Sequence, residues 1–212
     1  ILLSNVYHLS LRPGLKILEK AGGLHRFMAW EGPILTDSGG YQVFSLAAKR
    51  RIKEEGVTFA SHVDGSSHSL TPENVIQFEM GIGVDIAVPL DHCVQYPCER
   101  AEAEDALERT TRWAQRSKLC FDRGVGSRVE GVGKNTPATL HPKPLLFGIV
   151  QGAMYPELRR RSARQLTALG FDGYCLGGFS VGEPKAMMNE LLPAAAENLP
   201  EEKPRYVMGM GE

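Results

Sequence analysis

A carboxylate, two glycines, an aromatic ring and a primary amide stand together in the motif Asp37-Ser38-Gly39-Gly40-Tyr41-Gln42. The motif follows the apolar segment 32–36, so its carboxylate comes at the end of a predicted buried strand. The two glycines allow the backbone to approach a ligand closely, and Tyr41 offers a ring on which a flat ligand can stack. These residues indicate a site for a flat, hydrogen-bonding ligand, although short Gly-Gly motifs are also typical of an ordinary turn between two elements.

Other predicted strands end in the same way, with a polar residue or a glycine after an apolar run. The runs and the residues that follow them are 85–90 with Asp91, 145–150 with Gln151, 173–176 with Gly177 and 206–208 with Gly209. Near-continuous apolar runs of this length are typical of parallel strands that are buried on both faces. In a (β/α)8 barrel the active site forms at the C-terminal ends of such strands. We therefore expect these residues to share one end of a parallel sheet.

Helical patterns alternate with the strands. They are predicted at 15–20, from Thr71 onward, at 99–121, at 155–169 and at 184–198. Thr71 is a good N-cap residue and is followed by a proline and an acid, the residues favoured in a first helical turn. Strand–helix alternation with short links predicts an α/β fold with a parallel sheet.

The number of strand–helix units favours an incomplete TIM barrel. We count about six units between Ile1 and Tyr206, whereas a full (β/α)8 barrel takes about 250 residues and this chain has 212. The sequence therefore predicts a single partial barrel domain over residues 1–212, with an open doubly wound sheet as the alternative. Segment 57–66 alternates and turns at Asp64-Gly65, which predicts an inserted β-hairpin near 57–70. Segment 123–144 is predicted to be a surface loop.

The composition is typical of a globular domain without a membrane helix. The chain is 42% hydrophobic and 23% charged with a net charge of −1, as in a globular domain. No segment approaches the ~18 apolar residues of a membrane helix, so no membrane partner is expected. The four cysteines have no C-x-x-C spacing, and we expect reduced thiols in a cytoplasmic protein and no metal ligands in this chain.

Longer motifs, taken in order, resemble those of the tRNA-guanine transglycosylases. They are Ser4-Asn5-Val6-Tyr7-His8-Leu9, the segment 36–46, Ser61-His62-Val63-Asp64-Gly65-Ser66, Leu70-Thr71-Pro72-Glu73, 147–152, Phe171-Asp172-Gly173-Tyr174, Val181-Gly182-Glu183-Pro184 and the segment 203–209. The resemblance implies a zinc-containing (β/α)8 barrel that works as a homodimer. It also implies exchange of the wobble guanine in the anticodon loop of tRNAs with a GUN anticodon for a 7-deazaguanine, through a covalent enzyme–RNA intermediate.

The resemblance also assigns roles to residues of this chain. It implies a base pocket made by Asp37, Ser38, Gly39, Gly40, Tyr41, Asp91, Gln151, Gly178, Phe179 and Met208, and RNA contacts at Gly209, Met210, Gly211 and Glu212. In that pocket Asp91 accepts the guanine N1–H and 2-amino groups, while the Gln151 amide and the Gly178 N–H donate to O6. Tyr41 and Met208 sandwich the base, and Asp37 is the proton acceptor for the incoming base. From the residues alone, Asp91 could instead cap a helix, and Gln151 could satisfy a loop backbone.

The family pattern departs from this chain in two respects. The nucleophilic Asp of the family and its zinc ligands, three Cys and one His, are both expected later than Glu212. The chain is therefore predicted to be a fragment with the base-recognition half of the site, inactive by itself. A non-catalytic accessory paralogue and an archaeosine-type transglycosylase remain alternatives. An unrelated barrel enzyme that uses Asp37 and Asp91 as paired carboxylates is a further one.

Near neutrality is unusual for an RNA-binding protein, because phosphate contacts favour basic surfaces. Two local basic clusters exist, at 49–53 and 159–164, and a solvated helix face is the simplest interpretation of such a cluster.

The loop after Gly178 predicts which base is inserted. Val181 matches the valine of bacterial relatives that accept the small aminomethyl base preQ1, whereas relatives that accept queuine have glycine there. Ser180 fits the small residue expected before it, and Phe179 is expected to aim a backbone carbonyl at the aminomethyl ammonium. The sequence therefore predicts a preference for preQ1.

Overall fold

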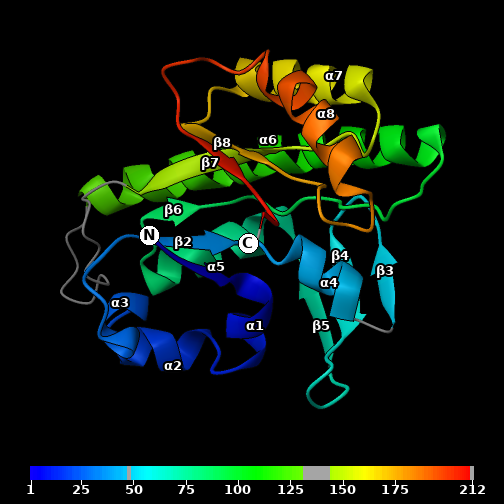
Figure 1. Cartoon of the computed structure of the whole chain (residues 1–212). Coiled ribbons are helices and arrows are strands. Elements are labelled where there is room, and N and C mark those ends of the chain that lie inside the picture. The colour runs from blue at the N-terminus through cyan, green and yellow to red at the C-terminus, as the bar shows by residue number, and fades with distance from the viewer. Residues whose placement is uncertain (47–48, 131–143, 211–212) are drawn as a thin grey trace. The chain divides into compact units, whose positions relative to one another are not determined.

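The computed structural model describes residues 1–46, 49–130 and 144–210 of the chain (Figure 1). The chain forms two compact units. Unit 1 contains residues 1–90 and 116–146, and unit 2 contains residues 91–115 and 147–212.

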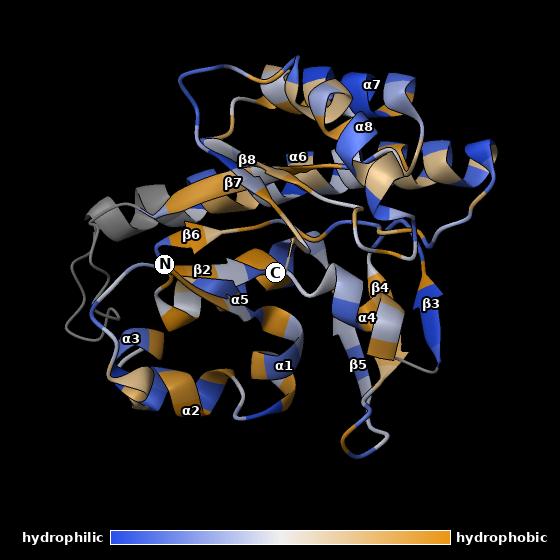
Figure 2. Ribbon diagram, in the orientation of Figure 1, coloured by the Kyte–Doolittle hydropathy of each residue, from blue (hydrophilic) through white to orange (hydrophobic). Residues whose placement is uncertain are grey.

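Unit 1 is built on parallel strands. Strand β1 (Leu2–Asn5) pairs with β2 (Ile34–Asp37), β2 pairs with β6 (Ile86–Ala87), and β6 pairs with the first two residues of β7 (Leu145–Val150). Strands β2, β6 and β7 are largely buried, whereas β1 is partly exposed, and Figure 2 shows β6 and β7 as largely hydrophobic. The register places Asn5 beside Asp37, at the C-terminal ends of β1 and β2.

Five helices accompany these strands. They are α1 (Val6–Leu11), α2 (Leu15–Lys20), α3 (Leu24–Met28), α4 (Gly40–Leu46) and α5 (Pro72–Ile82). Helix α5 begins as predicted, because the Thr71 hydroxyl accepts the Asn74 N–H at 3.1 Å while the Asn74 side chain accepts the Thr71 N–H at 2.7 Å. Helices α1, α3 and α4 were not predicted. None exceeds seven residues, too few for a helical period to be recognised in the sequence.

A separate antiparallel sheet in unit 1 consists of β3 (Arg50–Ile52), β4 (Val57–Ala60) and β5 (Ser67–Leu70). Strands β4 and β5 form the predicted hairpin, with Phe59 opposite His68. Strand β3 was not predicted, since three residues rich in arginine carry no strand signal in the sequence.

Unit 2 continues the parallel arrangement with the remaining residues of β7, then β8 (Gly173–Leu176) and β9 (Arg205–Val207). Helices α7 (Pro156–Leu169) and α8 (Lys185–Ala196) pack against each other, and α8 contacts β8 (Figure 1). The long helix α6 (Arg100–Glu130) contributes its first half to unit 2 and its second half to unit 1.

The strand order is β1-β2-β6-β7-β8-β9, and every neighbouring pair is parallel. Doubly wound sheets reverse their order at a switch point, whereas this order follows the chain without a reversal, as in a barrel. The predicted α/β fold of an incomplete TIM barrel with six strand–helix units and an inserted hairpin is therefore confirmed.

One prediction of local structure was wrong. Helix α6 extends to Glu130, so residues 123–130 are helical and do not form a surface loop; residues 131–143 of that predicted loop lie outside the described part. None of the helices in the part of the chain that the structure describes has the length and apolar character needed to cross a membrane.

Candidate active site

The Asp37 motif lies in unit 1 where β2 gives way to α4. Asp37 is the last residue of β2 and is partly exposed, Ser38 is fully buried, and α4 begins at Gly40. Tyr41 follows in the first turn of α4 with 42% of its surface exposed. A ring with this much exposed surface next to a carboxylate has room for a flat ligand to stack on it, and the stacking role of Tyr41 stays a prediction.

Gly39 is required by a close approach to Tyr7. Its φ is +86°, and a Cβ placed on it would lie 2.5 Å from the Tyr7 Cβ and 2.7 Å from the Tyr7 backbone nitrogen. Tyr7 is itself fixed, because its hydroxyl hydrogen-bonds the His62 Nδ1 at 2.8 Å and its ring stacks on the His62 ring. His62, which had no expected role, thus supports the glycine turn through Tyr7.

Glu79 is a buried acid beneath the motif that the sequence analysis missed. It has no exposed surface, its Oε1 accepts the Val88 N–H at 3.1 Å, and its Oε2 has no hydrogen-bond partner among the described residues. Burial raises the pKa of Glu79 well above its usual value, and the charge of Asp37 raises that pKa further. Its position on the apolar face of α5, four residues after Val75, is the signal that could have identified it.

We expect Glu79→Gln to keep the fold and to remove a pH dependence of stability. A raised carboxyl pKa means that the folded state holds its proton more tightly than the unfolded state, so stability falls as pH rises above about 4.5. The amide keeps an acceptor for Val88 but cannot ionise. In urea unfolding, the variant should therefore gain stability relative to wild type between pH 5 and pH 8. Glu79→Leu, which leaves the Val88 N–H unpaired, should lose about 1–3 kcal/mol at pH 5; equal losses in both variants would contradict this role.

Asp91 and Gln151 form a buried pair in unit 2. The Gln151 amide nitrogen donates to the Asp91 Oδ2 at 2.6 Å, and both side chains are buried. Burial raises the pKa of Asp91 to about 6, and the hydrogen bond from Gln151 offsets only part of that rise. Asp91 lies nine residues before the start of α6, so its carboxylate serves this pair and does not cap that helix.

Gly178 completes this group. Its φ is +64°, and a Cβ placed on it would lie 2.3 Å from the Gln151 Oε1. Because the Gln151 nitrogen is turned to Asp91, its oxygen is turned to Gly178, and only glycine leaves room for that orientation. The structure therefore brings together the three predicted residues Asp91, Gln151 and Gly178.

Arg159 holds the backbone around this group. Its guanidinium donates to the carbonyl oxygens of Ala153 at 2.7 Å, Gly177 at 2.9 Å and Gly178 at 2.9 Å, and lies 3.6 Å from the centre of the Phe179 ring. Burial lowers the pKa of Arg159 to about 9, which still leaves it cationic at neutral pH.

This finding corrects the interpretation of the 159–164 cluster as a solvated face. Arg159 is completely buried, while Arg160 pairs with Glu197 and Arg161 pairs with Glu104 and Glu108.

The segment after Gly178 is fixed by Glu183. Its carboxylate accepts the N–H groups of Ser180 at 2.6 Å and Val181 at 2.8 Å. Since the N–H and C=O of a trans peptide point in opposite directions, the Phe179 carbonyl is turned away from Glu183. A Cβ placed on Gly209 would lie 3.2 Å from that carbonyl oxygen. The carbonyl thus faces the segment that carries Met208.

Met208, which directly follows β9, is partly exposed. The Met208 N–H donates to the Leu176 carbonyl at 3.1 Å, so Met208 sits beside the end of β8. Gly209 and Met210 are exposed, whereas the predicted RNA contacts Gly211 and Glu212 lie outside the described residues.

The convergence of the Asp37 motif of unit 1 and the Asp91 group of unit 2 on one cavity stays a prediction.

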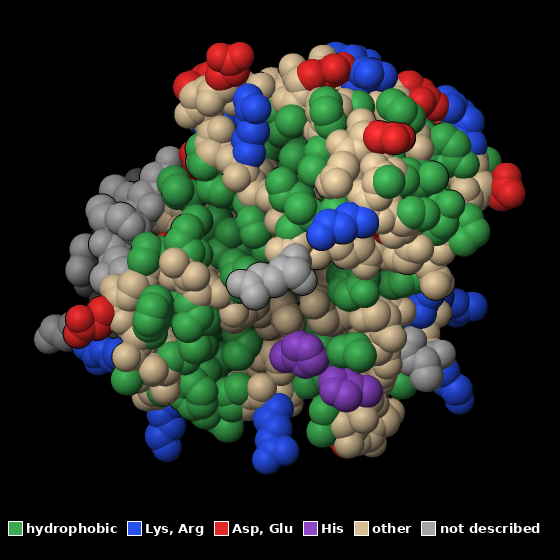
Figure 3. All heavy atoms as spheres, in the orientation of Figure 1, with side chains coloured by type: hydrophobic (Ala, Val, Ile, Leu, Met, Phe, Trp, Pro, Cys, Tyr) green, Lys and Arg blue, Asp and Glu red, His purple; other side chains and the backbone are tan. Residues whose placement is uncertain are grey.

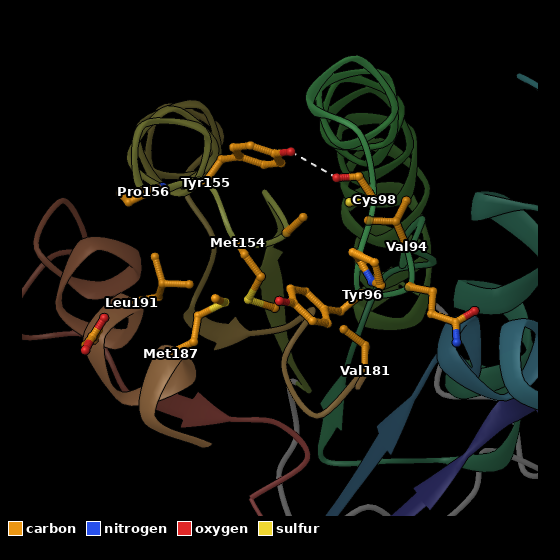
Figure 4. A pocket seen from close by; sticks show the side chains of 13 residues that line it. Val94, Tyr96, Cys98, Met154, Tyr155, Pro156, Val181, Met187 and Leu191 are labelled. Atoms are coloured by element: carbon orange, nitrogen blue, oxygen red, sulfur yellow. Dashed lines mark hydrogen bonds between the residues drawn. The ribbon is translucent and has the colours of Figure 1, made fainter. Parts of the chain in front are cut away.

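A pocket of about 560 Å³ in unit 2 lies beside the segment after Gly178 (Figure 4). Helices α7 and α8 and the segment 94–98 enclose it, and its lining is mainly apolar, with Met154, Met187 and Tyr96 among the side chains. Val181 forms part of its wall, and its carbonyl accepts the Tyr96 N–H at 3.2 Å.

The cysteines and the remaining titratable side chains give no metal centre in the described residues. There, no three His, Cys, Asp or Glu side chains are grouped as a metal ion requires. The zinc ligands that the resemblance implies are expected after Glu212, and that expectation stays a prediction. None of the four cysteines, Cys93, Cys98, Cys120 and Cys175, forms a disulfide bond. Burial raises the pKa of Cys98 and of Cys120, which disfavours the reactive thiolate.

Comparison with known proteins places the whole chain in one family. A family model described as Queuine tRNA-ribosyltransferase matches residues 1–212. The chain is 53% identical over 211 residues to the queuine tRNA-ribosyltransferase of Pelotomaculum thermopropionicum, with 100% of the chain and 52% of that relative covered. It is 52% identical to that of Desulforamulus reducens, with the same coverage, and 51% identical to that of Koribacter versatilis, with 54% of the relative covered. The chain spans about half the length of these relatives. It belongs to the queuine tRNA-ribosyltransferase family.

Proposed function

We propose that the full-length protein containing this chain is a tRNA-guanine transglycosylase. It exchanges the wobble guanine in the anticodon loop of tRNAs with a GUN anticodon for preQ1. The observation that carries the proposal is the buried pair of the Asp91 carboxylate and the Gln151 amide, joined at 2.6 Å. A carboxylate beside a primary amide offers the acceptors and the donor that match the polar edge of guanine.

The base-recognition chemistry follows from the hydrogen-bonding groups. Guanine presents N1–H and its 2-amino group side by side, and an ionised carboxylate accepts both. The Gln151 nitrogen carries two hydrogens; one is bonded to Asp91, and the second donates to guanine O6 together with the Gly178 N–H. The wobble base must leave its stack to reach these groups, and that costs little in a single-stranded loop.

The exchange is a double displacement at the ribose C1′. A carboxylate expected in the full-length protein after Glu212 attacks C1′, the glycosidic bond to guanine breaks, and an ester to the RNA forms. Guanine leaves with a proton taken at N9 from Asp37, which is then ionised. The incoming preQ1 then attacks C1′ through N9, the ester bond breaks, and Asp37 takes the N9 proton. Tyr41, with its open ring, and Met208 sandwich the base. A structural zinc held outside these residues, a homodimer and a cytoplasmic location belong to the same proposal.

The test is incorporation of labelled guanine and of preQ1 into tRNA by the full-length protein. A tRNA with a GUN anticodon should accept both bases, and the same tRNA with adenine at the wobble position should accept neither. Absence of incorporation into the first tRNA would overturn the proposal.

Base choice rests on Val181 and the Phe179 carbonyl. The carbonyl, turned away from Glu183, is an acceptor for the ammonium of an aminomethyl group. The Val181 side chain is buried and lines the 560 Å³ pocket. A bulky group at position 7 of the base would meet that side chain, and overpacking costs about 1–3 kcal/mol.

We expect Val181→Gly in the full-length protein to admit a base with a larger 7-substituent. Removal of the side chain opens the loop toward the pocket, so the efficiency with queuine should rise about tenfold or more relative to preQ1. Val181→Ile is the matched control, which keeps the wall and should retain the wild-type preference. The measurement is kcat/KM for preQ1 and queuine in parallel, and a wild-type enzyme that uses queuine as well as preQ1 would contradict the assignment.

A further inference from the structure

The outer face of the three-stranded sheet in unit 1 is cationic and rich in hydroxyl groups. Side chains alternate between the two faces of a strand, and Arg51 lies opposite Thr58, which lies opposite Ser69. Backbone hydrogen bonds from the Ala60 N–H to the Lys49 carbonyl and from the Lys53 N–H to the Gly56 carbonyl continue the pairing at both ends of β3. The alternation therefore also places Lys49 and Lys53 on the face of Arg51. All of these side chains are exposed, and Lys49 and Arg51 line part of a shallow hollow of about 640 Å³, to which Arg50 also contributes.

No polar contact engages the three basic side chains on this face within the described part of the chain. Among the described residues, neither Lys49 nor Arg51 nor Lys53 makes a side-chain hydrogen bond or ion pair. Arg50, on the opposite face, donates to the Phe44 carbonyl at 2.9 Å and lies 4.7 Å from the centre of the Phe44 ring. In the face shown by Figure 3, basic side chains project along the margin where Figure 1 has β3. These three positive charges are therefore available to an external anion.

The sheet is attached to the Asp37 motif at two points. The bond from Arg50 to Phe44 joins β3 to α4, the helix that begins at Gly40. The Phe59 ring of β4 lies 5.1 Å from the ring of Tyr7, which packs beneath Gly39. Helix α4 has seven residues and is about 10 Å long. About three nucleotides of a stacked strand cover such a distance.

We propose that Lys49, Arg51 and Lys53 bind the phosphate backbone of the RNA substrate, a few nucleotides from the base held at Asp37. This inference rests on the proposed function, because it takes RNA as the substrate. Cations with neighbouring hydroxyls are the groups that proteins use to bind phosphate oxygens, and such contacts position the RNA without reading its sequence. The site gives the protein a local basic surface despite its net charge of −1.

The experiment compares two double variants of the full-length protein. Lys49→Gln with Lys53→Gln removes two charges from the proposed surface. Lys16→Gln with Lys20→Gln removes two exposed charges from α2 and is the matched control. Affinity for a tRNA anticodon hairpin is measured over a range of salt concentrations, and free guanine binding is measured alongside.

We expect the first variant alone to lose RNA affinity. Each phosphate contact contributes about 0.7 to the slope of log K against log salt, so two lost contacts should reduce the slope by about 1.4 and the affinity about 25-fold at 0.1 M salt. Guanine affinity should not change. Equal salt slopes in the two variants would reject the proposed phosphate site. In that case, base exchange by the wild-type protein would still support the proposed function. Failure of the wild-type protein to bind or modify tRNA would instead reject the proposed function.

Discussion

Asp91→Asn in the full-length protein is expected to lose about a hundredfold or more in guanine affinity. An amide accepts one of the two guanine donors and turns its own N–H toward the other, so one charged hydrogen bond is lost and a donor is left unpaired. That combination costs about 3 kcal/mol in a buried site. The measurement is guanine binding by calorimetry, and unchanged affinity would contradict the role of Asp91.

The pH dependence provides a second measurement on the same variant. The pKa of Asp91 is about 6 in the free protein, and the proposed pairing with guanine requires the ionised form. Wild-type affinity should therefore be full above pH 6 and should fall toward tenfold per pH unit below it, because a proton must leave before the base can bind. The Asn variant has no ionisable group at this position and should show no such step.

Arg159→Met is expected to destabilise the protein by about 3 kcal/mol or more. The long apolar side chain fills the space, but three carbonyl oxygens at Ala153, Gly177 and Gly178 lose their donor in a buried region. The same change should weaken guanine binding, because the backbone at Gly178 is no longer held.

The control is the neighbouring substitution Arg160→Met. Arg160 makes an exposed ion pair with Glu197, and such pairs contribute about 0–1 kcal/mol. Urea unfolding of the two variants should therefore differ clearly. A small effect of Arg159→Met would show that water or other donors replace the guanidinium.

The sequence predicted Asp91 and Gln151 because each follows an apolar run. The end of a buried strand is visible in a sequence as the point where hydrophobic residues stop. Their pairing at 2.6 Å was not predictable, since the two residues are 60 positions apart and only the adjacent strand ends bring them together.

Arg159 was not predicted because it lies among other arginines that look like a solvated face. A signal was nevertheless present. The buried stripe of α7 consists of Leu158, Arg159, Ser162, Ala163 and Leu166. An arginine on such a stripe is a candidate for a buried donor.

The role of Tyr7 could not be predicted in this way, because its contact with Gly39 depends on the packing of α1 against the turn after β2. No periodicity in the sequence indicates that contact.

The hydrogen bond between Gln151 and Asp91 also bears on inhibitor chemistry. The two side chains already restrain each other before any ligand arrives, so a ligand need not spend binding free energy on ordering them. A compound that keeps this bond should carry two adjacent donors toward the carboxylate and one acceptor toward the second amide hydrogen. Fused heteroaromatic rings with an amino group next to a ring N–H meet that requirement, and a cationic amidine would additionally favour the ionised form of Asp91.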